Sequence, residues 1–269
     1  MKKIFSMSMI ALMAVAMLFV ACKKDENNNG NTDNPGGGGT VVTQPDGTIE
    51  NAVVTDIDGN VYNGVWLNSK LWMKENLRTT KYADGTTIPS ASADTQSSTE
   101  PHRYAPGDNK SNVSTYGYLY NWPAAVHGST SGGTVQGACP NGWHVPSNAE
   151  WDNMIEHLNT QEEYLCNGGI AAALCANSGW EPMADPHPCL PGTDLMSNNA
   201  TGFSALPAGI VNGNDSYVWG IGYCTSFWSS TGGGNNCAWS RSLHYDYWHI
   251  GSSAGDDRSN GYSVRCVRD

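Results

Sequence analysis

Basic residues are scarce in this sequence: Lys and Arg number 14 against 25 Asp and Glu, which gives a formal net charge of −11. Binding to nucleic acid or to anionic lipid depends on cationic contacts to phosphate, so this deficit argues against both kinds of partner. Phenylalanine is also rare, with 4 copies, whereas glycine has 31, tryptophan 10 and tyrosine 12. A chain so rich in glycine and so poor in charge favours short strands and long loops over long regular helices.

Long apolar runs are absent apart from one, which extends from Ile4 to Val20. It follows the cationic pair Lys2 and Lys3 and ends at a small residue, an order that predicts a secretory signal over residues 1–21. The next thirty residues are polar, so a membrane-spanning helix with a stop-transfer segment is the weaker interpretation.

The end of this segment, "LFVAC", resembles a bacterial lipobox, although Phe19 replaces the usual leucine. The resemblance implies cleavage before Cys22, a diacylglyceryl group on its thiol and an acyl chain such as palmitate on its amine. The following "KKDE" resembles the signal that sends Bacteroidetes lipoproteins to the outer face of the cell outer membrane. The alternative is an ordinary secreted protein with a stray cysteine.

Residues 22–50 are predicted to be a flexible tether, because Gly, Asn, Pro and Asp bury too little apolar area to offset chain entropy. The tripeptide from Gln44 to Asp46 matches a galactose-type motif of C-type lectins, which we attribute to chance. The folded domain is predicted to span residues 51–269.

An Asp-Gly turn at Asp58 lies between two β-prone runs, which predicts a hairpin. The spacing of Asp56, Asp58 and Asn60 also matches the start of a calcium loop. Such a loop needs Gly at its sixth position and Glu at its twelfth, where this chain has Val61 and Leu67. The hairpin is therefore favoured.

Within "ACPNGWHVPSNAEW", Ser147 and Glu150 have the spacing of a capping box. His144 has no ligand partner at helical spacing, so it is expected to be structural and Glu150 to be a cap, not a general acid. Apolar residues then follow at i, i+3, i+4 and i+7, which predicts one buried helix face. These residues are Trp151, Met154, Ile155 and Leu158.

Seven segments, in order, resemble the Fibrobacter succinogenes major paralogous domain family, over about Asp56 to Asp269. They are "LNSKLWMKENLRTTKYADGTTIP", "YGYLYNWPAAV", "CPNGWHVPSNAEW", "GFSALPAG", "FWSST", "AWSRSL" and "GYSVRCVRD". The resemblance implies an α+β, C-type-lectin-like fold: two short helices and a small twisted antiparallel sheet with long irregular loops. The family brings no established chemistry. The reactive cysteine pair of formylglycine-generating enzymes and the calcium motifs of lectins are not matched, so no cofactor, metal or catalytic residue is predicted.

Eight cysteines are present, and with Cys22 assigned to lipid seven remain for an oxidising compartment. The resemblance implies a disulfide between Cys139 and Cys266. Cys224 and Cys237 flank "FWSST", so a bond between them is a second candidate. Of the three remaining cysteines one must stay unpaired, and they lack the CxxC spacing of a zinc site. These are Cys166, Cys175 and Cys189.

Aromatic residues gather late in the chain, beside acidic and histidine side chains that suit stacking on a sugar or contact with a protein. Strand alternation predicts that Trp239, Arg241 and Leu243 share one face with the later tyrosines. The alternative is that these rings fill a core that is poor in phenylalanine. The predicted ligand-binding residues are Trp219, Tyr223, Tyr245, Asp246, Tyr247 and Trp248.

The sequence thus predicts a non-catalytic, lipid-anchored binding or adhesion protein of the cell surface, with an extracellular glycan or protein as ligand. One alternative is an enzyme that acts on envelope or dietary glycans, which would need two carboxylates across a cleft. Asp246, Asp256 and Asp257 are the candidates for such a pair. A purely structural surface protein is the other alternative.

Overall fold

The computed structural model describes residues 44–129, 134–185, 187–213 and 217–269. These residues belong to one compact unit. The predicted signal at residues 1–21, the predicted anchor Cys22 and the tether as far as residue 43 lie outside the described residues. Among the residues that are described, no helix is both long enough and apolar enough to cross a bilayer.

Strands predominate over helices in the described part of the chain. The strands are β1 (Ile49–Thr55), β2 (Val61–Leu67), β3 (Lys70–Met73), β4 (Arg103–Tyr104), β5 (Leu119–Tyr120), β6 (Trp143–His144), β7 (Ala208–Asn212), β8 (Tyr217–Ile221), β9 (Cys224–Gly234), β10 (Cys237–His244), β11 (Gly251–Asp257) and β12 (Val267–Arg268). The α-helices are α1 (Val113–Tyr116), α2 (Trp122–Val126), α3 (Asn148–Leu158) and α4 (Ala171–Leu174). Short 3₁₀ turns lie at η1 (Pro106–Asp108), η2 (Lys110–Asn112), η3 (Glu162–Tyr164) and η4 (Leu195–Ser197).

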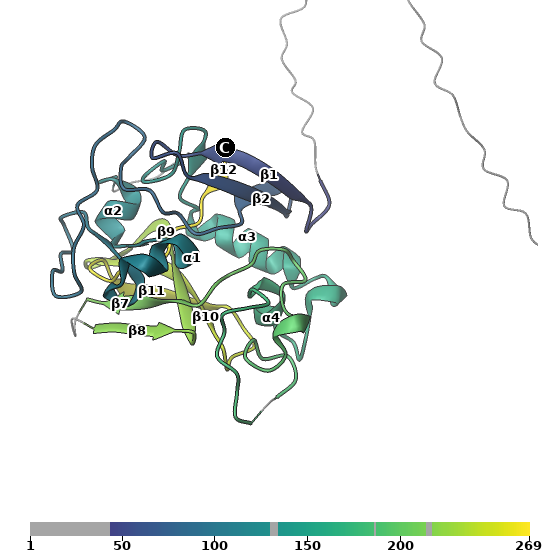
Figure 1. Cartoon of the computed structure of the whole chain (residues 1–269). Helices are drawn as coiled ribbons and strands as arrows, with labels where there is room; N and C mark the ends of the chain where they lie inside the picture. Colours follow the sequence, from purple (N-terminus) through teal and green to yellow (C-terminus); the bar gives the residue numbers. More distant parts are fainter. Residues whose placement is uncertain (1–43, 130–133, 186, 214–216) are drawn as a thin grey trace, which may run out of the picture. The chain divides into compact units, whose positions relative to one another are not determined.

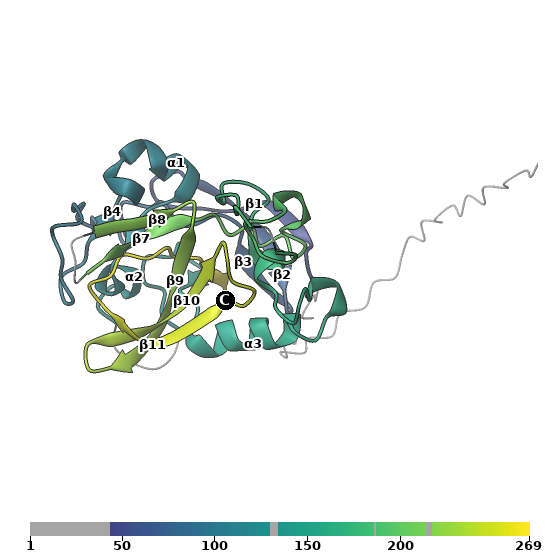
Figure 2. The same ribbon diagram turned by 90° about the horizontal axis from the view of Figure 1, so that it is seen from below.

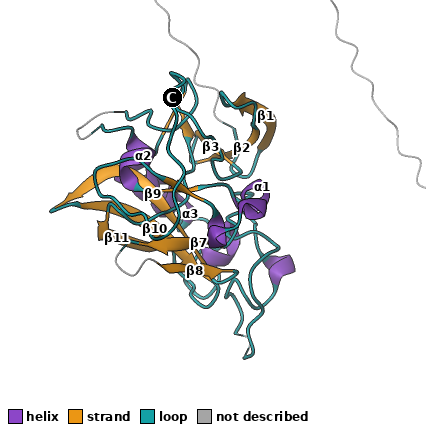
Figure 3. Cartoon of the chain, turned by 60° about the vertical axis from the view of Figure 1, so that its left-hand side comes forward, coloured by secondary structure: helices purple, strands orange, loops and turns teal. Residues whose placement is uncertain are grey.

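The strands form three sheets, so the fold is mixed α+β (Figure 1). The first has the order β1-β2-β3-β12-β6, the second β11-β10-β9-β7-β8, and the third pairs β4 with β5. This corrects the expected single small antiparallel sheet and two helices: there are three sheets, β7 runs parallel to β9, and four α-helices occur in the described ranges. Long loops separate α3 from β7, in keeping with the glycine-rich composition (Figure 3).

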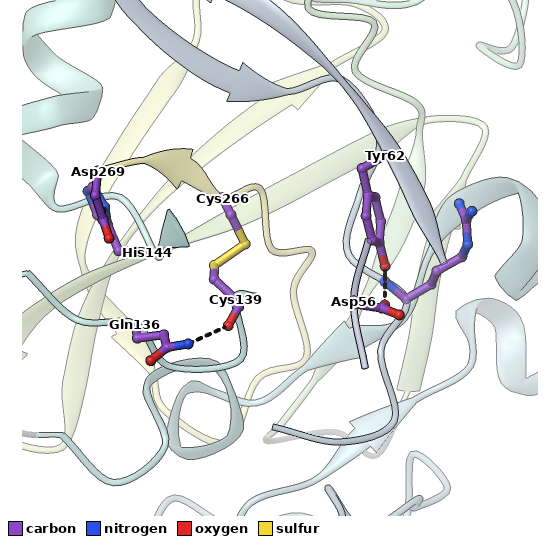
Figure 4. Close-up of a disulfide and its surroundings, with 8 residues drawn as sticks. Asp56, Tyr62, Gln136, Cys139, His144, Cys266 and Asp269 are labelled. Carbon is purple, nitrogen blue, oxygen red and sulfur yellow. Dashed lines mark hydrogen bonds and ion pairs between the residues drawn. A yellow bond between two sulfur atoms is a disulfide. The ribbon is translucent and has the colours of Figure 1, made fainter. Parts of the chain in front are cut away.

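The predicted hairpin at Asp58 is confirmed, since β1 and β2 are antiparallel partners around it. The carboxylate of Asp56 accepts hydrogen bonds from the backbone N–H groups of Asp58 and Asn60, at 3.0 and 2.9 Å, and from the Tyr62 hydroxyl at 2.7 Å. Figure 4 shows Asp56 and Tyr62 facing one another. The Asp56 carboxylate therefore stabilises the turn through these hydrogen bonds.

The capping box that starts α3 is also confirmed. The Ser147 hydroxyl accepts from the Glu150 backbone N–H at 3.2 Å, and the Glu150 carboxylate accepts from the Ser147 N–H at 2.9 Å. Trp151, Met154 and Leu158 are buried, as the apolar spacing predicted, whereas Ile155, also predicted for this face, is half-buried against the core. α3 thus lies with one face in the core, beside β2 and β3 (Figure 2).

Tryptophan takes the place of phenylalanine in much of the core. The rings of Trp72 and Trp151 have centroids 4.8 Å apart, and Phe203 and Phe227 pack against Trp151 at 6.0 and 5.7 Å. All four side chains are at most 1% exposed. Because such rings each bury a large apolar area, this cluster fixes α3 against the sheets.

A disulfide joins Cys139 to Cys266, the pair that the resemblance implied (Figure 4). Cys266 immediately precedes β12, which pairs with β3 on one side and β6 on the other. Cys139 lies four residues before β6. The bond therefore ties together neighbouring strands of the first sheet that are distant in sequence.

The folded unit begins before the predicted boundary at residue 51. β1 starts at Ile49, and the Asp46 carboxylate accepts from the Asn68 backbone N–H at 2.7 Å. The same carboxylate lies 2.6 Å from Nε2 of His157 on α3. Residues 44–50 are therefore part of the domain instead of the tether, because their polar groups find partners inside it.

Candidate ligand-binding surface

The six predicted ligand residues differ in their exposure. Trp219, Tyr223 and Tyr247 are 47%, 43% and 48% exposed, which is unusual for such large apolar side chains. Asp246 is exposed, whereas Tyr245 and Trp248 are half-buried. The alternative that all of these rings fill the core is therefore wrong for the first three.

Tyr223 and Tyr245 form a pair at the open end of the β9–β10 hairpin. Their ring centroids are 5.1 Å apart with the planes at 88°, an edge-to-face contact. The Tyr245 backbone N–H also donates to the Tyr223 carbonyl at 2.9 Å, which continues the pairing of Cys224 with His244. The hairpin thus fixes the relative orientation of two rings that are far apart in sequence.

A loop that the sequence did not single out supports this pair. The Gly192 N–H donates to the Tyr245 carbonyl and the Glu181 N–H donates to the Gly222 carbonyl, both at 2.8 Å. A Cβ on Gly192 would lie 2.7 Å from the Glu181 carbonyl and 3.0 Å from the Tyr245 ring, so only glycine fits there. No local sequence pattern predicts this contact, because it joins three distant segments.

The turn after β10 holds the other predicted residues. The Trp248 carbonyl accepts from the N–H of Ala171, the first residue of α4, at 3.0 Å, and Gly169 packs against the Trp248 backbone. The Tyr247 side chain, by contrast, is exposed. Among the described rings it contacts only that of His249, with the ring centroids 5.6 Å apart. The turn is therefore anchored through its backbone while one aromatic side chain is left to solvent.

Electrostatics around this turn are mild. Burial lowers the pKa of His244, and the nearby Asp246 opposes that shift. His244 is thus neutral near pH 7 and can act as donor or acceptor to a polar ligand.

Trp219 stands apart from the other five residues. It lies on β8 opposite Ile210 of β7, and among the described aromatic residues it makes no ring contact. The structure therefore brings Tyr223 and Tyr245 together, places Tyr247 and Trp248 on the adjoining turn, and leaves Trp219 on a separate strand.

Arg241 and Leu243 share the buried face of β10, as strand alternation predicted, and the Arg241 guanidinium lies 5.9 Å from the centre of the Trp239 ring. The strand ends at His244, so alternation does not extend to the later tyrosines. The register of β10 with its neighbours shifts between Ala238 and Ser240, where the extra residues lie in β9 and β11. Arg241 is fully buried, with its guanidinium 2.5 Å from Asp152 Oδ1. It serves as a structural ion pair between β10 and α3.

The candidate bond between Cys224 and Cys237 is also wrong, since both are free thiols. In the β9–β10 ladder Cys224 lies opposite His244, and Cys237 lies opposite Gly234. The two cysteines therefore stand at opposite ends of this hairpin. Ten strand residues separate these ends by roughly 30 Å, far beyond the reach of a disulfide.

Among the other three cysteines the structure pairs Cys166 with Cys189 and leaves Cys175 free and buried. The sequence left this choice open. The bond ties the loop that supports Tyr245 to the segment that precedes α4. No cluster of three metal-ligating side chains occurs in the described ranges.

The carboxylates considered for catalysis are occupied by local contacts. Asp256 accepts from the hydroxyls of Ser240 and Ser253, and Asp257 accepts from the backbone N–H and hydroxyl of Ser259 at 2.8 Å. These bonds shape β11 and the turn after it. Asp246 lies on the exposed turn after β10.

Comparison with known proteins gives one match. A family described as the Fibrobacter succinogenes major domain matches residues 65–268. No curated protein and no solved structure matches the chain. The matched range includes α3 and all six predicted ligand residues.

Proposed function

The chain belongs to the Fibrobacter succinogenes major domain family, and from this premise we propose that it is a lipid-anchored binding protein of the bacterial cell surface. In this proposal Cys22 carries the lipid, the outer membrane holds the protein, and the domain binds an extracellular glycan or protein without catalysis. The domain has a C-type-lectin-like fold, in which long loops carry the binding residues.

The exposure of Tyr223 and Tyr247 carries the proposal. Exposed aromatic rings gain most when a sugar face or an apolar protein surface covers them, and Tyr is enriched where proteins bind partners. The Tyr223 ring is held by Tyr245 and the Tyr247 backbone lies in a turn pinned by α4, so binding costs little side-chain ordering. The net charge of −11 favours a neutral or cationic ligand.

Binding can be tested with the full chain on glycan and protein arrays. We expect a specific ligand, and we expect Tyr223→Ala and Tyr247→Ala each to weaken it at least tenfold, since each removes an exposed ring. Met196→Ala is the matched control, because Met196 is 81% exposed and lies outside the predicted set. Equal binding by all three variants would place the ligand elsewhere and sink the proposal for this surface.

The anchor is tested separately by growing cells with labelled palmitate. The wild-type chain should take up label and partition into the detergent phase. Cys22→Ala should do neither, because no thiol remains for the diacylglyceryl group. Undiminished labelling of Cys22→Ala would rule the anchor out without bearing on the ligand-binding surface.

A further inference from the structure

A groove is lined by residues of β2, of β3 and of α3 and by none of the six predicted ligand residues. Figure 2 shows how α3 lies relative to β2 and β3. Its volume is about 370 Å³, within the range of small-molecule sites. Its lining includes Trp72, Met154, Lys70, Asn153, Glu156 and His157. We call it the α3 groove.

The floor of the α3 groove is apolar. Leu67, Trp72 and Met154 line it and are at most 1% exposed as residues. The indole N–H of Trp72 is buried and has no hydrogen-bond partner within the described part of the chain. A buried donor without an acceptor is rare and costs free energy, so a ligand oxygen that reached this N–H would form a hydrogen bond that the protein itself leaves unmade.

The rim of the α3 groove divides into occupied and free polar groups. Glu150 is occupied, because its carboxylate bonds to Lys70 at 3.0 Å, to His144 and to Ser147. His157 is engaged through Nε2 with Asp46.

Two rim side chains are free. Asn153 and Glu156 are exposed, and among the described residues their side chains have no hydrogen-bond partner. They lie three residues apart on α3, so they stand on neighbouring positions of the same helix face. An amide and a carboxylate so placed can bond to adjacent hydroxyl groups of one ligand.

We infer that the α3 groove binds a neutral, hydroxyl-rich ligand the size of one sugar ring. A sugar ring has an apolar C–H face, which suits the floor of Trp72 and Met154, and an edge of hydroxyls, which suits Asn153 and Glu156. Hydroxyl oxygens also accept from an indole N–H. Anionic ligands are disfavoured, because the rim carries the carboxylates of Glu150 and Glu156 against one ammonium group.

This site shares no residue with the surface of the proposed function, so the two stand or fall separately. A second hollow, lined by Gln44, Asp46 and Tyr164, shares Asn68 and His157 with the α3 groove. A ligand longer than one ring can therefore extend toward the start of the domain.

The test follows the indole N–H signals of the full chain, labelled with ¹⁵N-tryptophan in detergent micelles. The probes are methyl β-D-glucopyranoside, methyl β-D-galactopyranoside and N-acetylglucosamine, with glucuronate as the anionic contrast. Trp72→Phe identifies the Trp72 signal. We expect a neutral probe to shift that signal and glucuronate to bind at least tenfold more weakly. The Trp122 signal is the internal control, since its N–H donates to the Ser229 carbonyl at 2.9 Å and Trp122 does not line the groove.

Rim variants separate a binding role from a folding role. Asn153→Ala and Glu156→Ala should weaken the neutral probe at least fivefold, and both sites are exposed, so both variants fold. Asn159→Ala and Glu162→Ala are matched controls outside the groove and should bind as the wild type does. Tyr223→Ala should bind normally as well.

The inference is overturned by any of three results: no neutral probe shifts Trp72, glucuronate binds equally well, or the rim variants bind unchanged. Loss of the shift in Tyr223→Ala would also overturn it, since the ligand would then sit on the other surface.

Discussion

Nε2 of His144 lies 2.9 Å from Oε1 of Glu150, so a buried imidazole is joined to the cap of α3. Its Nδ1 lies 2.5 Å from Oδ1 of Asp269, the contact seen in Figure 4. His144 is 4% exposed. Burial opposes a charge on the ring, but the hydrogen bonds that the imidazole donates to Glu150 and Asp269 outweigh it and raise the pKa of His144. Burial also opposes the charge on Glu150, but its bonds with His144, the Ser147 N–H and Lys70 hold the pKa of Glu150 well below its usual range.

The free energy of unfolding should therefore fall as the pH rises above neutrality. A raised folded pKa gives a contribution that is complete below the unfolded value of about 6.5 and is lost as the pH passes the folded value. The Glu150 contribution is present above the unfolded value of about 4.5. The contributions of His144 and Glu150 to the free energy of unfolding are both complete between about pH 4.5 and about pH 6.5. The urea midpoint should drop between about pH 6 and about pH 9 in the wild type and drop less in His144→Gln. An equal drop in the variant would contradict this account.

Ser147→Ala should lower the free energy of unfolding by about 1 kcal/mol, because the first turn of α3 loses its side-chain acceptor. Urea denaturation of both proteins measures the difference. Ser252→Ala is the control, since Ser252 is exposed and its hydroxyl has no partner in the described residues, and it should change stability by less than about 0.5 kcal/mol. Similar losses in the two variants would mean that the cap contributes nothing.

Trp151→Ala should destabilise the domain by about 3–5 kcal/mol, because it leaves a cavity among Trp72, Phe203 and Phe227. Trp219→Ala is the matched change at a residue that is 47% exposed, and it should cost far less. Thermal unfolding followed by circular dichroism compares them. A Trp219→Ala loss as large as that of Trp151→Ala would show that the exposed ring is part of the core.

Thiol labelling should distinguish the three cysteines that are free within residues 44–269 as the structure describes them. Cys237 is half-buried and should react with a maleimide in the native protein. Burial raises the pKa of Cys224 to about 12 and that of Cys175 well above its usual value, so both should react only after denaturation. Peptide mass mapping assigns the labelled sites. Native labelling of Cys224 or Cys175, or label on Cys166 or Cys189 without reductant, would contradict the structure.

Local patterns predicted local structure well. Ser147 and Glu150 predicted the start of α3, and Asp58 predicted the β1–β2 hairpin. Both predictions succeeded because a helix cap and a tight turn depend on contacts within a few residues. The register shifts beside Trp239 were not predicted, and they arise from extra residues in β9 and β11. A bulge has no signature in strand alternation, so it could not be foreseen.

Contacts between distant segments lay beyond sequence reasoning. The α3 groove combines Trp72 with Asn153 and Glu156, which are about eighty residues further along the chain. The partner of Cys189 depended on how the loop around Gly192 folds against Tyr245. The exposure of a side chain likewise depends on how distant segments pack. The sequence could therefore propose Tyr247 as a ligand-binding residue, but it could not predict that the ring is exposed to solvent.

The place of β12 between β3 and β6 governs how the protein must be made. Its partners precede it by more than a hundred residues, and Cys139 must wait equally long for Cys266. While the chain is being synthesised, the edges of β3 and β6 remain unpaired, and unpaired edges are where chains aggregate. The first sheet is therefore completed only after residue 268 has been released, and a chaperone or a slow oxidation step would act on an open intermediate that lacks the interior strand β12.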